Sequence, residues 1–381
     1  MDLQDYRAQI DKVDDELLAL FKKRMGISGQ IAQFKKEHGL QALDAARERE
    51  KLADIGEKAG DDIRSFAYIL YTTLFEISRA HQVNIINAES DLNKIISGAV
   101  EHTERVFPQH ALVACQGVEG AYSQIACDRL FSDPNILYFT GFEGVFSAIR
   151  DGLCQYGLLP LENSTAGSVN MVYDLMMKYS FKIARSVRLK IDHNLLVKAG
   201  VKKENIREIF SHEQAIQQCA GYLKGLGKNV KVTTVANTAE AAKMVAESDR
   251  NDIAALASRS CCDLYALKCL ESSVQDRGNN YTRFICISKN LEIYPGADRT
   301  SIMLTTSHKP GSLYKVLGLI YALGVNVVKL ESRPIPDRDF EFMFYFDLET
   351  SVYSKKFSQL MCELENLCEE FHYLGSYTEI V

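Results

Sequence analysis

The amino-acid sequence is short of several features that would assign it to a class of protein at once. No stretch approaches the roughly 20 apolar residues that a membrane-spanning helix needs, and the N-terminus MDLQDYRAQI has no apolar core behind a basic segment. Basic residues are not in excess, because 44 Lys and Arg stand against 50 Asp and Glu, a formal net charge of −6. We therefore expect a cytoplasmic protein that binds neither nucleic acid nor a membrane.

Motifs for metals and nucleotides are missing as well. The ten cysteines lie at irregular spacings, and neither a C-x-x-C pair nor an H-E-x-x-H helix occurs. No G-x-G-x-x-G or G-x-x-x-x-G-K-[ST] sequence is present. We predict reduced thiols that mostly pack in the interior, no bound metal and no cofactor.

Proline is absent from residues 1–82, which carry a long helical periodicity, whereas short apolar runs alternate with helical patterns from about residue 106. The 381 residues, 46% of them hydrophobic, suffice for two or three separate cores. We predict a multidomain chain with an all-α domain at 1–85, a linker at 86–105, an α/β domain at 106–286 and an α+β domain at 298–381. The sequence does not decide the conformation of the linker. The last domain shows a βαββαβ order, which predicts a ferredoxin-like sandwich.

An arginine interrupts the apolar seam of the first helix. Residues at alternating spacings of three and four form this seam: Leu3, Tyr6, Ile10, Val13, Leu17, Leu20, Arg24, Ile27, Ile31 and Phe34. A helix of about 50 Å is too long for a short chain to cover by folding on itself, so an intertwined helical dimer is expected. Lys35 follows Arg24 by 11 residues and lies within about 20° of it on the helix. A cation buried without a partner would cost several kcal/mol. Three arrangements avoid this cost: both side chains extend to the solvent-exposed edge of the seam, they pair with carboxylates of another helix, or they bind an anion.

Further polar residues accompany these two cations. Arg7 opens the first helix, DAARERE opens a second at 44–50, and a third ends with Ser78 and Gln82 one turn apart. Residues 3–82 thereby resemble the all-helical chorismate mutase domain, which implies a three-helix protomer that dimerises through its first helices. The resemblance implies that carboxylates of the substrate bind Arg24, Arg47 and the partner protomer's Arg7. It assigns Lys35 and Gln82 to the ether oxygen, with Asp44, Glu48 and Ser78 around the hydroxyl-bearing ring; Lys35, Gln82 and Glu48 would be catalytic.

The rearrangement of chorismate to prephenate explains why these residue types are needed. It occurs within one molecule, through a folded conformer in which a carbon–oxygen bond breaks and negative charge gathers on oxygen. Cations that clamp two carboxylates select the reactive fold, and donors at the ether oxygen stabilise the developing charge.

Short polar motifs punctuate the α/β region: GVEGAYSQIA at 117–126, ENSTAGSV at 162–169, SHEQAIQQC at 211–219, NTAEAA at 237–242 and NYTRF at 280–284. Taken singly, they are open to plainer explanations. ENSTAGSV fits a capped loop, Ser211 and either Asn237 or Thr238 fit helix N-caps, and Arg283 could balance Asp276.

Together, the five motifs resemble the prephenate dehydratase catalytic domain in order and separation. The resemblance implies two α/β lobes, similar to a type II periplasmic binding protein, with the site in the cleft between them. Prephenate loses carbon dioxide and hydroxide, so the enzyme mainly assists the leaving hydroxyl. Thr282 is the predicted donor to that hydroxyl and Arg283 the ligand of a carboxylate, while Glu162 or Glu240 is the competing acid if burial raises its pKa. The residues expected to line the cleft are Glu162, Asn163, Ser164, Ser211, Gln218 and Glu240.

PGSLYKVL at 310–317 and ESRP at 331–334 mark the C-terminal region. A capped helix and a surface ion pair would explain them, but both segments also resemble the ACT regulatory domain. That resemblance implies that L-phenylalanine binds between two such domains and inhibits the dehydratase. The implied contacts are Gly311, Ser312, Leu313, Asn326, Glu331 and Ser332.

Two other functions fit parts of the sequence. Arogenate dehydratase uses the same fold on an aminated substrate, although fusion to a mutase favours prephenate. A non-catalytic amino-acid or carboxylate sensor would need neither ether-oxygen nor leaving-group donors such as Lys35 and Thr282. Prephenate dehydrogenase requires a dinucleotide fingerprint that the chain lacks. A homodimer or a higher homo-oligomer is expected, with its size undecided.

Overall fold

The computed structural model describes residues 2–40, 42–86, 90–227, 229–336 and 338–381. The chain divides into two compact units, Met1–Ile95 with Lys355–Cys368 and Ile96–Ser354 with Glu369–Val381. Each unit is described by itself. The residues predicted as a linker contain helix α3 (Asp91–His102), while residues 87–89 of that linker lie outside the described part.

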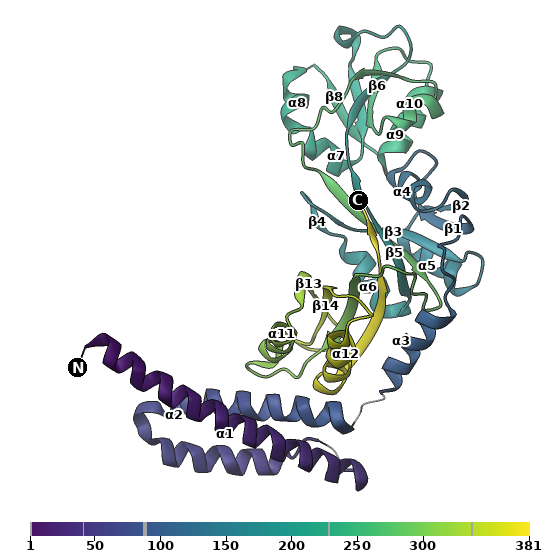
Figure 1. The fold of residues 1–381 in the computed structure, drawn as a ribbon. Helices are drawn as coiled ribbons and strands as arrows, with labels where there is room; N and C mark the ends of the chain where they lie inside the picture. Colours follow the sequence, from purple (N-terminus) through teal and green to yellow (C-terminus); the bar gives the residue numbers. More distant parts are fainter. Residues whose placement is uncertain (1, 41, 87–89, 228, 337) are drawn as a thin grey trace. The chain divides into compact units, whose positions relative to one another are not determined.

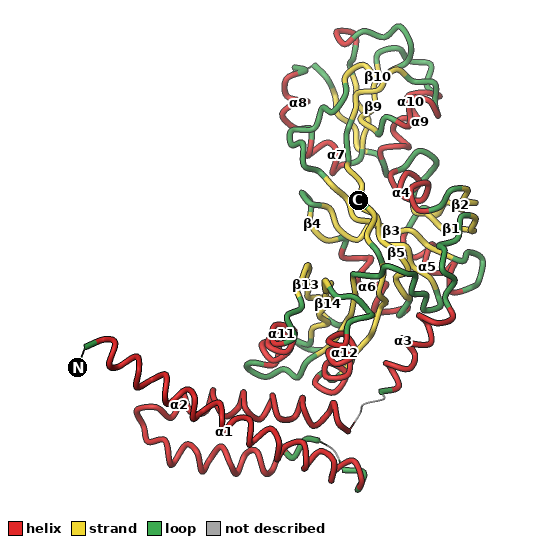
Figure 2. The backbone as a smooth tube through the Cα atoms, viewed as in Figure 1, coloured by secondary structure: helices red, strands yellow, loops and turns green. Residues whose placement is uncertain are grey.

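The first unit is helical (Figure 1; Figure 2). It contains α1 (Leu3–Glu37), α2 (Ala45–Ile86) and α12 (Lys355–Leu367). Gly60 interrupts α2 with φ +71°, a left-handed conformation that glycine adopts without steric cost. The chain turns back at this glycine, so α1 and the two halves of α2 are the three helices that the sequence predicts.

The apolar residues of the predicted seam of α1 are exposed, although Arg24 within the seam contacts α2. Leu17 and Leu20 remain 56% and 64% exposed, and the other apolar seam residues are exposed to a similar degree. Ser28 and Ala32 are buried instead, on the face of α1 that contacts α2. Among the described residues of this unit, a continuous apolar stripe is therefore left without a partner.

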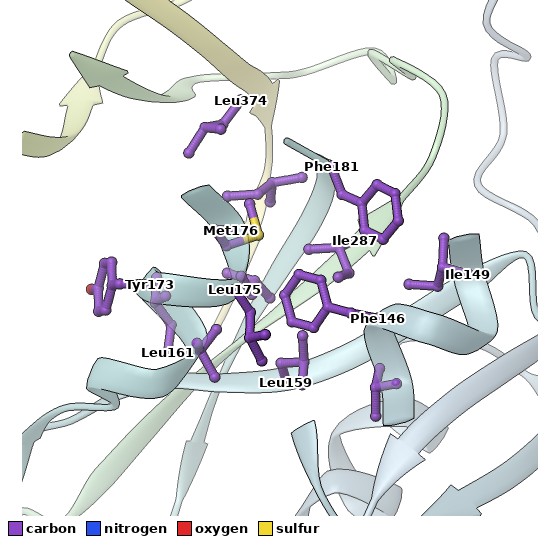
Figure 3. Close-up of a cluster of buried hydrophobic side chains, with 14 of the residues drawn as sticks. Phe146, Ile149, Leu159, Leu161, Tyr173, Leu175, Met176, Phe181, Ile287 and Leu374 are labelled. Atoms are coloured by element: carbon purple, nitrogen blue, oxygen red, sulfur yellow. The ribbon is translucent and has the colours of Figure 1, made fainter. Parts of the chain in front are cut away.

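The second unit contains a two-lobed α/β region whose first lobe is built on a seven-stranded sheet. Its strands run in the order β16-β5-β11-β3-β1-β2, with β4 paired to β3. Their bounds are β1 His110–Gln116, β2 Asp133–Phe139, β3 Tyr156–Asn163, β4 Gly167–Ser168, β5 Lys182–Lys190, β11 Tyr281–Ser288 and β16 Glu379–Ile380. The helices of this lobe are α4 Tyr122–Leu130, α5 Phe142–Arg150 and α6 Asn170–Tyr179. Alternate strand residues such as Leu159 and Leu161 pack with Phe146 and Met176 in its core (Figure 3).

The second lobe is inserted between β5 and β11. Its sheet has the order β10-β6-β9-β7-β8. The strands are β6 Asn194–Val197, β7 Glu208–Ser211, β8 Lys231–Thr234, β9 Ile253–Ala257 and β10 Lys268–Glu271. Its helices are the 3-10 turn η1 Lys203–Asn205, α7 Glu213–Gln218, α8 Ala220–Gly225, α9 Thr238–Glu247 and α10 Ser260–Leu264. The chain thus passes between the lobes twice, from β5 to β6 and from β10 back to β11.

A four-stranded antiparallel sheet in the order β13-β14-β12-β15 follows. Its strands are β12 Arg299–Thr305, β13 Asn326–Pro334, β14 Phe342–Glu349 and β15 Glu370–Tyr377, and α11 Ser312–Ala322 connects the first two. With α12 the order along the chain is the predicted βαββαβ. The sheet shares the core of the first lobe, where Tyr345 meets Tyr173 edge to face at 4.9 Å. Gly375 allows this close approach, because a Cβ there would lie 2.5 Å from the carbonyl oxygen of Ile183.

All ten cysteines are described, and each is a free thiol; most are buried. In the described part of the chain, every helix is too short or too polar to span a bilayer.

Candidate active sites and regulatory site

Two cations of α1 lie against the last turns of α2. Arg24 Nη1 donates to the Ser78 hydroxyl and, at 3.0 Å, to the carbonyl of Leu74. Lys35 Nζ lies 3.2 Å from Gln82 Oε1 and 2.5 Å from the carbonyl of Ala42. Among the described residues no carboxylate forms an ion pair with either cation, and burial lowers the pKa of Arg24. A partly buried cation without a counter-ion favours the binding of an anion.

Polar side chains complete this cluster. Ser28 accepts a hydrogen bond from Gln82 Nε2 at 3.1 Å and donates to the Ser78 carbonyl at 3.3 Å. Glu48 accepts from Arg79 Nη1 at 2.5 Å. Hydrogen bonds thus connect four of the eight predicted mutase residues, Arg24, Lys35, Ser78 and Gln82, directly or through Ser28, and Glu48 contacts Arg79, the neighbour of Ser78.

The three others lie elsewhere in the single chain. Arg7 precedes Arg24 by 17 residues on the same helix, about 26 Å along its axis. The Arg47 side chain pairs with Glu50 in solvent, and Asp44 accepts from the Arg47 backbone N–H at the start of α2. Arg7 can complete the cluster only from a second copy of the chain.

A hydrogen-bonded network joins the two lobes of the second unit. Asn163 Nδ2 donates to Thr282 Oγ1 at 2.9 Å and to Asn280 Oδ1 at 2.8 Å. Asn280 Nδ2 donates to Gln218 Oε1 at 2.8 Å, and Gln218 Nε2 donates to Thr165 Oγ1 at 2.8 Å. Gln218 belongs to the second lobe and the other four to the first lobe or the strand that returns to it. The network is buried at Asn163, Asn280 and Thr282 and exposed at Thr165.

Backbone groups set the direction of the hydrogen bonds at Asn163. The backbone N–H groups of Thr165 and Ala166 donate to Asn163 Oδ1 at 3.0 and 2.9 Å. The amide nitrogen of Asn163 must therefore face Thr282, whose hydroxyl oxygen accepts. The hydroxyl hydrogen of Thr282 is left free to be donated to another group.

Arg283 and Glu162 correct the prediction, because they lie on the opposite face of the same strands. Successive strand residues point to opposite faces, and the register pairs Thr282 with Asn163 and Arg283 with Glu162. The buried Arg283 guanidinium contacts the carboxylates of Glu162 at 3.1 Å, Asp347 and Glu379. It has neither the exposure nor the direction to bind a substrate beside Thr282. Glu162 is likewise excluded as an acid beside Thr282.

The remaining predicted residues of this domain have separate contacts. Ser164 donates to the Asn279 carbonyl and accepts from the Tyr281 N–H, which fixes the loop before β11. Ser211 is fully buried and donates to the Leu256 carbonyl, while His212 caps α7, so Ser211 is not the cap. Asn237 caps α9 by accepting from the Glu240 N–H. The plainer alternative for Arg283 fails too, since Asp276 accepts from backbone N–H groups at residues 221 and 222.

A pocket of about 360 Å³ lies at the start of α11. Gly311 precedes this helix with φ +84°, and Ser312 and Leu313 line the pocket with Phe342 and Phe344. Ser332 pairs with Phe344 on the neighbouring strand. Four of the six residues predicted for phenylalanine therefore gather at or beside one pocket.

Glu331 and Asn326 differ from that prediction. The Glu331 carboxylate accepts from Ser168 of the first lobe at 2.5 Å and lies 3.5 Å from Lys329 Nζ, so it points toward the first lobe. Asn326 begins β13, about 20 Å along the strand from Ser332, and donates to Glu349. Alternation along β13 explains the direction of Glu331, because residues 329, 331 and 333 face the lobe while Ser332 faces away.

Comparisons with known proteins cover nearly the whole chain. Residues 6–83 match the family model "Chorismate mutase type II", and residues 113–292 match "Prephenate dehydratase". A bifunctional chorismate mutase/prephenate dehydratase of Aquifex aeolicus is 30% identical over 99% of this chain and 98% of its own. The chain belongs to this bifunctional family. It is an enzyme with a chorismate mutase domain and a prephenate dehydratase domain, and it acts in phenylalanine biosynthesis.

Other relatives cover the dehydratase and C-terminal parts of this family member. An Arabidopsis thaliana arogenate dehydratase/prephenate dehydratase is 34% identical over 70% of this chain and 72% of its own. The solved prephenate dehydratase of Arthrobacter aurescens in complex with L-Phe has a TM-score of 0.64 at 24% identity, over 70% of this chain and 89% of its own. This last similarity shows the fold.

Sequence reasoning on this bifunctional enzyme missed several residues that the structure places in the networks: Ser28, Arg79, Thr165, His193 and Asn280. Ser28 follows Arg24 by one helical turn, a spacing that could have revealed it. Thr165 and Asn280 lie inside the quoted motifs ENSTAGSV and NYTRF. Nothing in the local sequence distinguishes His193, whose contact with Gln218 depends on tertiary structure.

Proposed function

We propose that the mutase reaction takes place at the cluster of Arg24 and Lys35, with Arg7 supplied by a second copy of the chain. The absence of counter-ions for both cations among the described residues carries this proposal. Arg24 holds a carboxylate, Lys35 and Gln82 donate to the ether oxygen, and Glu48 and Ser78 contact the ring. The exposed seam of α1 supports an intertwined dimer, because only a partner helix covers so long a stripe.

For the dehydratase we propose that prephenate binds beside the interlobe network, with Thr282 donating to the departing ring hydroxyl. The free hydrogen of Thr282 is the observation that supports this role. As the carbon–oxygen bond breaks, charge gathers on the leaving oxygen, and an oriented donor stabilises it. The substrate supplies the driving force, since loss of carbon dioxide and hydroxide makes the ring aromatic. Glu240, half-buried in the first turn of α9, remains the competing acid.

Prephenate is the proposed substrate in preference to arogenate, because the fused mutase produces prephenate. The experiment is to supply purified protein with chorismate and to follow prephenate and phenylpyruvate. Appearance of prephenate and then phenylpyruvate supports the assignment. A higher kcat/KM for arogenate than for prephenate would replace it with arogenate dehydratase.

We further propose that the C-terminal sheet is an ACT domain whose pocket, at residues 311–313 and Ser332, binds L-phenylalanine between two copies. The L-Phe in the structure of the Arthrobacter aurescens relative supports this ligand. Inhibition requires tighter binding to the less active arrangement, and a coupling of about 1–3 kcal/mol is typical.

An ionic bridge offers the route from this pocket to the dehydratase. Lys329 on β13 lies 2.7 Å from Glu162 on β3, and Glu162 contacts Arg283, the neighbour of Thr282. The test compares Ser332→Ala with Lys329→Met. The first should weaken phenylalanine binding, whereas the second should retain binding and lose inhibition. Full inhibition in both variants would contradict the proposal.

A further inference from the structure

A buried histidine lies where the chain crosses between the two dehydratase lobes. His193 is 3% exposed and stands in the first crossing, between β5 and β6. The second crossing is bound to it, because the His193 N–H donates to Gln275 Oε1 at 2.9 Å and the Val274 N–H donates to the His193 carbonyl at 2.8 Å. The backbone of His193 is therefore held in place where the two crossings between the lobes meet.

The ring of His193 contacts the interlobe network directly. Its Nε2 lies 2.8 Å from Gln218 Oε1, the oxygen that also accepts from Asn280. The bond directions set by the backbone at Asn163 pass through Asn280 to Gln218, which leaves this oxygen as an acceptor. Nε2 must therefore carry a hydrogen and donate it.

The other ring nitrogen indicates the charge state. Among the described residues, Nδ1 of His193 is buried without a hydrogen-bond partner. A proton there would be a buried donor with no acceptor, and burial lowers the pKa of His193 accordingly. Tyr122 lies edge-on to the ring, and Asp192 precedes it, with its side chain held by Gln275. The neutral Nε2–H form is the one that these contacts favour.

Among the described residues, Gln218 is the one member of the network that lies on a helix of the second lobe. Its Oε1 accepts from His193 Nε2 and from Asn280 Nδ2, and its Nε2 donates to Thr165 Oγ1 of the first lobe. Without the imidazole, the Gln218 amide can rotate, and Asn280 loses the acceptor that orients it. Asn280 in turn accepts from Asn163, the donor that orients Thr282.

We propose that His193 is a positioning residue of the dehydratase: its Nε2–H fixes Gln218 and, through Asn280 and Asn163, the direction of the Thr282 hydroxyl. This inference rests on the proposed role of Thr282. His193 itself does not contact the substrate; it acts through the network.

The test measures kcat and KM for prephenate in His193→Leu and His193→Gln, with the mutase activity of the same proteins as an internal control. A glutamine can place an N–H near the position of Nε2, whereas leucine cannot. His193→Leu should lower kcat about tenfold, the loss of one hydrogen bond, with little change in KM. His193→Gln should stay within about threefold of the parent protein.

A double-mutant cycle with Gln218→Leu separates positioning from general destabilisation. Leucine at both positions should be no worse than Gln218→Leu alone, because the histidine acts through that amide. The proposal is overturned if His193→Leu is as active as the parent, if His193→Gln is as impaired as His193→Leu, or if the two losses multiply. Thr282→Val is measured alongside: an active Thr282→Val would refute the site itself, whereas an inactive one with a fully active His193→Leu refutes only the inference.

Discussion

The two candidate active sites solve the binding of closely related molecules in different ways. In the mutase cluster, Arg24 and Lys35 carry charge that nothing described in the chain neutralises, and the long seam beside them is exposed. In the dehydratase network, neutral amides and hydroxyls satisfy one another within a single chain, and the strong cation Arg283 is turned to the opposite face.

The difference follows from what each reaction asks of its enzyme. The mutase must fold a flexible dianion and stabilise charge on an ether oxygen, which calls for fixed cations. The dehydratase substrate already contains its driving force, so one oriented donor suffices. We therefore expect the mutase to be sensitive to charge and to assembly, and the dehydratase to the geometry of hydrogen bonds.

The largest expected effect is on the mutase cations. Arg24→Ala and Lys35→Ala should each lower mutase kcat/KM by about 10²–10³, because each removes a charged donor from a partly buried site. Dehydratase activity on added prephenate should be unchanged in both variants. Lys36→Ala is the matched control, an exposed lysine at the next position, and should match the parent protein.

Thr282→Val should lower dehydratase kcat by about 10², since it removes the oriented donor at nearly constant volume. Thr282→Ser retains the hydroxyl and should recover most of that activity. Steady-state assays with prephenate measure both. If Thr282→Val is as active as Thr282→Ser, the leaving hydroxyl receives its proton from another group. Glu240→Gln would then be the next variant to examine.

Breaking the seam should separate the two activities. Leu17→Asp places a carboxylate on the exposed apolar stripe and should dissociate the proposed dimer, which light scattering detects. Mutase activity should fall at least about tenfold if the partner supplies Arg7 as proposed, while dehydratase activity should persist. Lys23→Asp is the control, because Lys23 lies on a polar and exposed part of α1. A dissociated protein with full mutase activity would remove Arg7 from the site.

The smallest expected effect is on stability against pH. Burial lowers the pKa of His193 in the folded protein below its ordinary 6.5, so the unfolded chain takes up a proton that the folded chain does not. The free energy of unfolding should therefore fall as the pH drops below about 6.5. His193→Gln should flatten this dependence, and urea unfolding at several pH values would detect it. His372, whose pKa is also lowered by burial, leaves a residual slope.

The periodicity of apolar residues predicted much of the fold. The strand-like runs predicted at 111–115, 156–161 and 283–288 correspond to β1, β3 and β11, and the seam identified α1. The four-residue strands β6, β7 and β10 were missed, whereas β8, of the same length, was predicted because it lies within the longer alternating run at 229–235. The final predicted strand, near residues 372–380, is divided in the structure into β15 and the two-residue β16. The sequence does not reveal this division, because β16 pairs with β5, almost 200 residues earlier in the chain.

The sites divide in the same way. Helical spacing brings Arg24, Lys35, Ser78 and Gln82 together, since one face of a helix can be read from residue numbers. The error at Arg283 shows the limit of a motif: the sequence places it next to Thr282, but strand alternation sends it to the other face. The prediction for Glu331 meets the same limit, because the neighbouring Ser332 points to the exposed face of β13 and Glu331 points to the other face.

The most direct test supplies chorismate to the parent protein, to Arg24→Ala and to Thr282→Val, and follows prephenate and phenylpyruvate in time. The parent should form prephenate and then phenylpyruvate. Arg24→Ala should form little of either from chorismate yet convert added prephenate at the parent's rate, and Thr282→Val should accumulate prephenate. Phenylpyruvate formed by Thr282→Val as fast as by the parent would contradict the account.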